Sequence, residues 1–94
     1  MSGGHFDYKQ YHISDIVDKI QKVIDENDSD EINSYGDILG RHYPSDIIND
    51  FKEGILLLGI AEVYAQRIDW LLSGDDSEDG FRRRLRYDLV NLPQ

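Results

Sequence analysis

The chain has 94 residues, with 19 acidic and 10 basic side chains and a formal net charge of −9. This length is enough for one small domain spanning residues 1–94, and the excess of carboxylates repels phosphate groups, so we expect no direct contact with nucleic acid or with a membrane. The absence of cysteine excludes disulfides and cysteine-ligated zinc and favours a reducing cytoplasm. We predict no signal peptide, because the first residues are neither basic nor apolar, and no membrane span, because the most apolar stretch, residues 54–65, is shorter than the ~20 residues that a bilayer requires.

The chain is predicted to open with an irregular arm, residues 1–12, followed by an amphipathic helix at residues 13–27. Apolar side chains at the spacing of one helix face indicate this helix: Ile13, Ile16, Val17, Ile20, Val23 and Ile24. An earlier start, with Asp7 and Gln10 in a capping box, is the alternative. It would place the two tyrosines of the arm opposite the apolar stripe.

Residues 28–44 are dense in Asn, Asp, Ser, Gly and Pro, which predicts a loop. The loop nevertheless contains five large apolar side chains: Ile32, Tyr35, Ile38, Leu39 and Tyr43. A disordered linker rarely carries so many. We therefore expect this loop to pack back against the helices.

A long helix is predicted at residues 46–72. Ser45 and Asp46 are typical of a helix start, and Gly74 suits the left-handed position that follows a helix end. The acidic turn after Gly74 contains a capping box that opens a third helix at residues 76–91. The short connection makes these two helices antiparallel neighbours. The predicted fold class is therefore all-α, a three-helix domain around one long central helix.

The apolar face of the long helix changes sides along its length. In the first half, one arc of the helix carries Ile47, Ile48, Phe51, Ile55 and Leu58. In the second half, the opposite arc carries Leu56, Ile60, Val63, Tyr64, Trp70 and Leu71. The arc that was apolar in the first half then carries Glu62, Gln66, Asp69 and Ser73. Such a helix needs neighbours on two sides.

The second neighbour of this helix has three candidates: the loop, the arm and another copy of the chain. We favour cover by a segment of the same chain over a homodimer through the long helix. Gly54 and Gly59 lie near the change of side and lower helix stability by roughly 1 kcal/mol each. They indicate either the close approach of a neighbour or a kink.

Arg67 lies in the middle of the second apolar arc, where an unpaired guanidinium would be costly to bury. We favour an internal salt bridge to a carboxylate such as Asp7 or Asp79, with Trp70 or Tyr64 stacked on the guanidinium. The alternative is an anion clamp for a ligand phosphate or a partner carboxylate.

The only basic cluster is Arg82, Arg83, Arg84 and Arg86. Helical geometry separates these side chains, and we expect pairs one turn apart, such as Arg84 with Asp88. In the arm, Phe6 and Tyr8 are expected to dock near Trp70.

No catalytic motif is present, and the three histidines are too scattered for a metal site. We therefore predict no enzyme activity, no cofactor and no metal. The candidate ligand- or partner-binding residues are Arg67, Trp70, Tyr64, Tyr11, Tyr8, Phe6 and His5.

The opening segment MSGGHFDY, residues 1–8, and the segment YAQRIDWLLSGDD, residues 64–76, carry a resemblance that extends through the whole chain. They resemble a family of short uncharacterised proteins encoded by phages, prophages and gut bacteria. The resemblance implies no assigned activity. Small acidic proteins encoded by phages and prophages often act stoichiometrically, by blocking a host factor or sequestering a signal molecule.

We therefore expect a non-catalytic, cytoplasmic binding protein that acts by stoichiometric protein–protein interaction, such as inhibition of a host defence or regulatory protein with a basic surface. One alternative is a homo-oligomer that sequesters a small ligand or nucleotide with Arg67, Trp70 and Tyr11. Another is a structural or assembly component.

Overall fold

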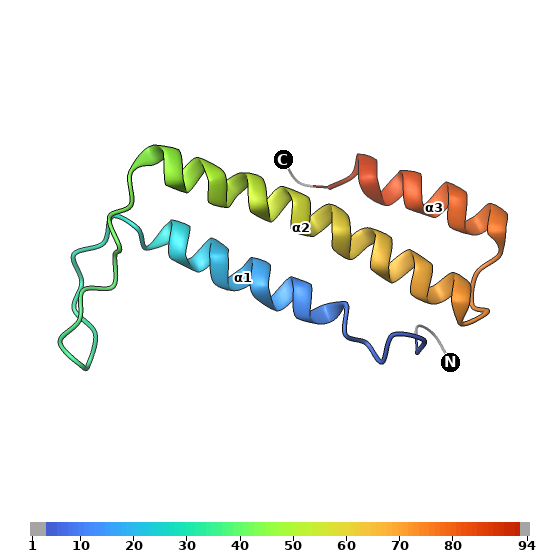
Figure 1. Cartoon of the computed structure of the whole chain (residues 1–94), viewed down its shortest axis with the longest axis horizontal. Coiled ribbons are helices and arrows are strands. Elements are labelled where there is room, and N and C mark those ends of the chain that lie inside the picture. The colour runs from blue at the N-terminus through green and yellow to red at the C-terminus, as the bar shows by residue number, and fades with distance from the viewer. Residues whose placement is uncertain (1–3, 93–94) are drawn as a thin grey trace.

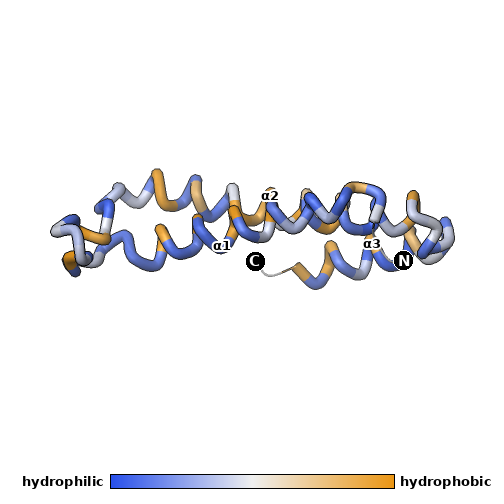
Figure 2. The backbone as a smooth tube through the Cα atoms, turned by 90° about the horizontal axis from the view of Figure 1, so that it is seen from below, coloured by the Kyte–Doolittle hydropathy of each residue, from blue (hydrophilic) through white to orange (hydrophobic). Residues whose placement is uncertain are grey.

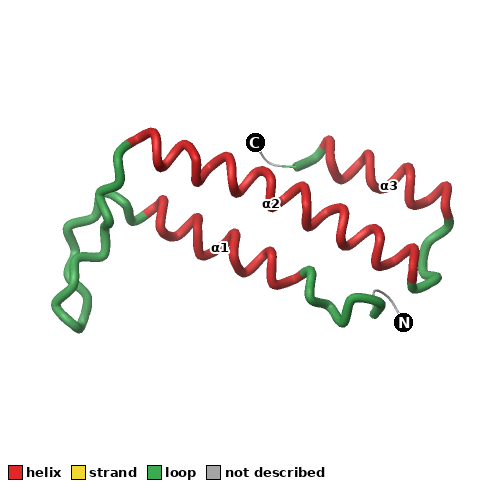
Figure 3. The backbone as a smooth tube through the Cα atoms, viewed as in Figure 1, coloured by secondary structure: helices red, strands yellow, loops and turns green. Residues whose placement is uncertain are grey.

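The computed structural model describes residues 4–92, so the first three residues of the predicted arm lie outside it. It contains three helices, α1 (Tyr11–Asp25), α2 (Ser45–Leu72) and α3 (Glu78–Val90). Consecutive helices run antiparallel, and α2 lies in the middle (Figures 1 and 3). This arrangement confirms the all-α, three-helix fold around one long central helix.

The three helices form a single layer. The molecule measures 52 × 26 × 14 Å, and its shortest dimension is little more than the ~10–12 Å diameter of one helix with its side chains. Both α1 and α3 pack against α2, whereas no contact joins α1 to α3 over their described residues. Figure 2 shows the thinness of the layer from a second direction. The central helix therefore has two large faces without a helix of this chain upon them.

A flat layer of this kind has almost no interior. Among the described residues, no apolar side chain is buried, and the only fully buried side chain is that of Asp69. The radius of gyration is 17.3 Å, compared with about 12 Å for a compact domain of this length. The solvent-accessible area is 6976 Å², compared with about 5,600 Å² for a typical monomer of 10.9 kDa. Apolar contacts between the helices are therefore only half-buried.

The two neighbours that the apolar arcs of α2 require are both helices of this chain. On one side, Phe51 of α2 and Tyr43 before it line a hollow together with Ile20 and Val23 of α1. On the other side, α3 packs along the second half of α2. The prediction that α2 has different neighbours on two sides is confirmed, but for these two arcs the neighbours are the helices α1 and α3, and not the loop, the arm or another copy of the chain as proposed.

The helix ends follow their capping signals only in part. Ser77 caps α3 by accepting a hydrogen bond from the Gly80 N–H at 2.9 Å, and Gly74 adopts a left-handed φ of 80°. By contrast, α1 begins at Tyr11 without a side-chain cap. The alternative capping box of Asp7 and Gln10 is therefore wrong, because Gln10 makes its hydrogen bonds with α2 instead.

The loop between α1 and α2 does not pack back on the helices as expected. Ile32, Tyr35 and Ile38 are all exposed, and Tyr35 is 87% exposed. The base of the loop contacts the helical layer, where the Tyr43 ring meets Phe51 edge-on at 5.6 Å. Further along the loop, Asp37 and Ile38 line a hollow together with Lys22 of α1. The expectation is thus wrong for the tip of the loop, which projects beyond one end of the layer (Figure 1).

The glycines suggest a matched pair of substitutions. At Gly40, an added β-carbon would meet the carbonyl oxygens of Asn27 and Glu26 at 2.7 and 2.8 Å and that of Ser29 still closer. At Gly59, within α2, it would meet only a methyl group of Leu92 at 3.8 Å. We therefore expect Gly40→Ala to lower the free energy of unfolding by more than about 2 kcal/mol and Gly59→Ala to raise it by about 0.5–1 kcal/mol. Urea unfolding followed by circular dichroism measures both, and equal effects of the two variants would contradict this assignment of their surroundings.

Candidate binding surfaces

The arm is attached to α2 through the carboxylate of Asp69. The Phe6 N–H donates to Asp69 Oδ1 at 3.0 Å, and the Gln10 side-chain amide donates to Asp69 Oδ2 at 3.0 Å. Asp69 is 0% exposed and Gln10 is 4% exposed. Hydrogen bonds to a carboxylate that is shielded from water are among the stronger polar contacts in proteins. The arm is therefore held on α2 by polar contacts.

Two further polar residues of α2 extend this attachment. Gln66 accepts a hydrogen bond from the Gln10 amide at 2.7 Å and donates one to the Tyr11 hydroxyl at 3.3 Å. Ser73 accepts one from the His5 N–H at 3.1 Å. These contacts explain why Gln66, Asp69 and Ser73 are polar, because this side of the helix faces the arm.

Two residues of the arm are held in a backbone conformation that side chains disfavour. Asp7 and Tyr8 have φ values of 54° and 61°, and the left-handed region costs roughly 1–2 kcal/mol for a residue with a β-carbon. The attachments at Phe6 and Gln10 lie on either side of this pair and maintain the conformation. The ring of Tyr8 stacks on that of Tyr11 with the ring centroids 6.3 Å apart, and both side chains are exposed.

Arg67 makes the predicted internal salt bridge, but with a different partner. Its Nε lies 2.6 Å from Asp88 Oδ2, and its guanidinium lies 4.7 Å from the Trp70 ring. The Arg67 side chain is 14% exposed. The proposed partners Asp7 and Asp79 are both wrong, because the carboxylate that faces this side of α2 comes from the last turns of α3.

Two members of the basic cluster, Arg82 and Arg84, are also paired. Arg84 pairs with Asp76 at 2.5 Å and not with Asp88 as expected, and Arg82 pairs with Asp79 at 3.0 Å. A hollow of about 410 Å³ lies beside Arg67 and Arg84. The guanidinium groups of Arg67 and Arg84 are each already paired with a carboxylate. Neither is therefore free to bind the anion of a ligand, as the alternative of an anion clamp at Arg67 requires.

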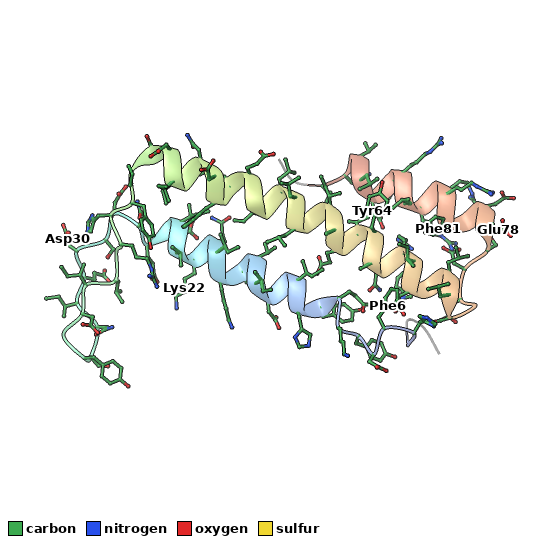
Figure 4. All side chains as sticks on the ribbon, viewed as in Figure 1. Phe6, Lys22, Asp30, Tyr64, Glu78 and Phe81 are labelled. Carbon is green, nitrogen blue, oxygen red and sulfur yellow. The ribbon has the colours of Figure 1, made fainter. Side chains whose placement is uncertain are left out.

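The seven candidate residues fall into two groups on different sides of α2. His5, Phe6, Tyr8 and Tyr11 belong to the arm and the first turn of α1, and the His5 and Phe6 rings meet edge-on at 5.3 Å. Arg67 and Trp70 face α3, whereas Tyr64 is 42% exposed and lies opposite Phe6 in Figure 4. The hydrogen bonds of the arm go to Gln66, Asp69 and Ser73, and Tyr11 is not brought together with Arg67.

Sequence reasoning did not identify a third surface, the projecting part of the loop at residues 28–43, which we call the finger. Ile32 and Ile38 form an antiparallel bridge, and the Leu39 N–H donates to the Glu31 carbonyl at 2.8 Å. At the tip, Asn33 Oδ1 accepts hydrogen bonds from the N–H groups of Tyr35 and Asp37 at 2.8 and 3.1 Å. The finger is therefore a hydrogen-bonded turn and not a loose linker.

The base of the finger is closed by Asn27. This buried side chain accepts a hydrogen bond from the Tyr43 N–H at 2.9 Å and donates one to the Tyr43 carbonyl at 3.0 Å. Above this closure, the finger carries the exposed Ile32, Tyr35 and Ile38. It also carries four exposed acidic residues, Asp28, Asp30, Glu31 and Asp37, which we call the acidic rim. Beside Asp37 and Ile38, the basic Lys22 and Arg41 line the same hollow.

Two further kinds of feature, a membrane-spanning helix and a metal-binding cluster, are not found among the described residues. No helix among them is long and apolar enough to span a membrane, and no group of three or more histidine, aspartate or glutamate residues could hold a metal ion. No protein family matches the chain, and no curated protein or solved structure shows significant similarity to it.

The attachment of the arm can be tested at Asp69. In Asp69→Asn, the new amide faces the Gln10 amide, so two donors oppose each other, and we expect a loss of about 1–3 kcal/mol of stability and faster hydrogen exchange at the Phe6 amide. Adding Gln10→Glu restores a donor–acceptor pair. It should recover part of the stability and slow the hydrogen exchange at the Phe6 amide again. A double variant no more stable than Asp69→Asn would contradict the proposed pairing.

The salt bridge of Arg67 can be tested separately. Asp88→Ala leaves a mostly buried guanidinium without its carboxylate and should lower stability by about 1–3 kcal/mol. Asp79→Ala removes an exposed ion pair on the same helix, and we expect a change of less than about 0.5 kcal/mol. Thermal unfolding compares the two variants, and the fluorescence of Trp70, the single tryptophan, reports on the guanidinium beside it. Equal losses of stability in the two variants would show that the salt bridge of Asp88 to Arg67 contributes no more than an exposed ion pair.

Proposed function

We propose that the protein is a non-catalytic binding protein that attaches to a protein partner through the finger. The observation that carries this proposal is the exposure of Ile32, Tyr35 and Ile38 on a turn whose backbone is hydrogen-bonded internally. Exposed side chains of this size are common at protein interfaces, where tyrosine is especially enriched.

The rigidity of the finger supports the same proposal. A flexible loop must lose conformational entropy when it binds, and that loss lowers affinity. The bridge between Ile32 and Ile38, the Asn33 contacts and the closure at Asn27 already fix the backbone. Most of this entropy is therefore lost on folding and not on binding.

The charges around the finger indicate the nature of the partner. The acidic rim favours a surface with an apolar pocket surrounded by lysine or arginine, which would increase the rate of association at low salt. The net charge of −9 acts in the same direction. The partner is therefore a basic protein surface, and binding is expected to weaken as salt is added.

Such binding would act stoichiometrically, with one copy of the chain occupied for each partner surface that it blocks. Inhibition of a host defence or regulatory protein is the form that agrees with the family resemblance of the sequence. This assignment rests on the resemblance and on the charge.

Variants of the finger test this function. The whole chain is used to select binding domains from a displayed library of bacterial proteins, and the affinity of each selected partner is measured by calorimetry. We expect Tyr35→Ala to weaken binding at least tenfold, as for a central interface tyrosine. The matched control is Ile16→Ala, which removes an exposed apolar side chain from α1 and should leave the affinity unchanged.

Two results would contradict the proposal. One is a selection that yields no partner. The other is a partner that binds wild type and Tyr35→Ala equally well or binds independently of salt, because neither behaviour fits an aromatic contact within an acidic rim.

A further inference from the structure

One face of α2 is apolar and has no cover within the described chain. Its residues follow one another at intervals of three or four along the helix, and we call them the back row: Gly54, Leu57, Ala61, Tyr64, Ile68 and Leu72. Leu57 is 56% exposed, and Tyr64 and Leu72 are also exposed. No charged residue belongs to the row. Neither α1 nor α3 covers it, because they pack on the two flanks of α2.

We infer that a second copy of this chain covers the back row, with the two α2 helices antiparallel about a two-fold axis between Ala61 and Tyr64. The first argument is area. Each chain exposes about 1,400 Å² more surface than a typical monomer of its mass. A stable homodimer commonly buries 1,000 Å² or more on each copy. The excess is therefore as large as the surface that such a dimer removes from water.

The second argument is the order of small and large residues in the back row. With the two-fold axis between Ala61 and Tyr64, Ala61 faces Tyr64 of the partner subunit. By the same symmetry, Leu57 faces Ile68 of the partner subunit, and Gly54 faces Leu72 of the partner subunit. Each small residue thus lies opposite a large one, which is the complementarity that close helix packing requires.

A parallel pair would lack this complementarity. Each residue would then face its own copy, so two glycines and two alanines would leave gaps while two tyrosines would collide. Antiparallel helices also have opposed dipoles, which attract each other. Gly54 is consistent with this arrangement, because nothing within the chain lies within 4 Å of the position of an added β-carbon there. The space is therefore open to the side chain of a neighbouring chain.

This inference is independent of the proposed function. The finger lies at the end of the layer, away from the back row (Figure 1). Salt should also act in opposite directions, because it screens the repulsion between two chains of charge −9 but weakens contact with a basic partner. Tyr35→Ala should therefore leave self-association unchanged, and failure of one proposal is distinguishable from failure of the other.

Light scattering of the full chain gives the first test. We expect a mass of twice 10.9 kDa for the wild type, and a monomer with unchanged helix content for Leu57→Glu, because the substitution places a charge in the apolar interface. The control Val90→Glu adds the same charge at an exposed position of α3 and should remain a dimer. A monomeric wild type, or a dimeric Leu57→Glu, would overturn the inference.

Cysteine cross-linking gives the second test, which is clean because the chain has no cysteine. Ala61→Cys should form a disulfide with its own copy across the two-fold axis. Leu72→Cys should not, because the two sites would be about 28 Å apart along the helix axis. A mixture of Leu57→Cys and Ile68→Cys chains should give the mixed cross-linked dimer. Self-cross-linking of Leu72→Cys would overturn the antiparallel arrangement.

Discussion

The carboxylate of Asp69 is the point on which the position of the arm depends. A single layer of helices offers no deep apolar interior, so apolar burial alone does not fix how its segments are joined. Asp69 accepts hydrogen bonds from Phe6 and Gln10, and each bond requires a particular direction and distance. The turn at Asp7 and Tyr8, which is unfavourable by itself, is kept in place by these contacts. In this fold a polar group thus provides specificity that larger domains obtain from a packed core.

The sequence predicts the elements of this fold well and their partners less well. Periodicity and capping residues locate the three helices, because these signals are local. The partner of Arg67 is not local, and it depends on how far α3 extends along α2, which brings Asp88 to the guanidinium. Asp69 appears on a helical wheel as one more polar residue of a solvated arc. Nothing in its sequence neighbours shows that the arm returns to it.

The finger shows a different limit of sequence reasoning. Large apolar residues in a loop are usually anchors, and this interpretation holds for Tyr43 at the base. It fails for Tyr35, because the turn is stabilised by Asn33 and does not need an apolar anchor at its tip. In an antiparallel pair of chains, the two fingers would lie at opposite ends of the assembly. The molecule would then be bivalent, and a partner that is itself oligomeric would bind it with a gain from effective concentration.

The attachment of the arm also determines an order of events during synthesis. Phe6 leaves the ribosome early, but its acceptor on Asp69 is 63 residues further along the chain. The helical hairpin of α2 and α3 closes over a short connection and forms rapidly, whereas the arm must close a loop of more than half the chain. The arm, which is synthesised before the three helices, is therefore expected to reach its native contacts after they have formed.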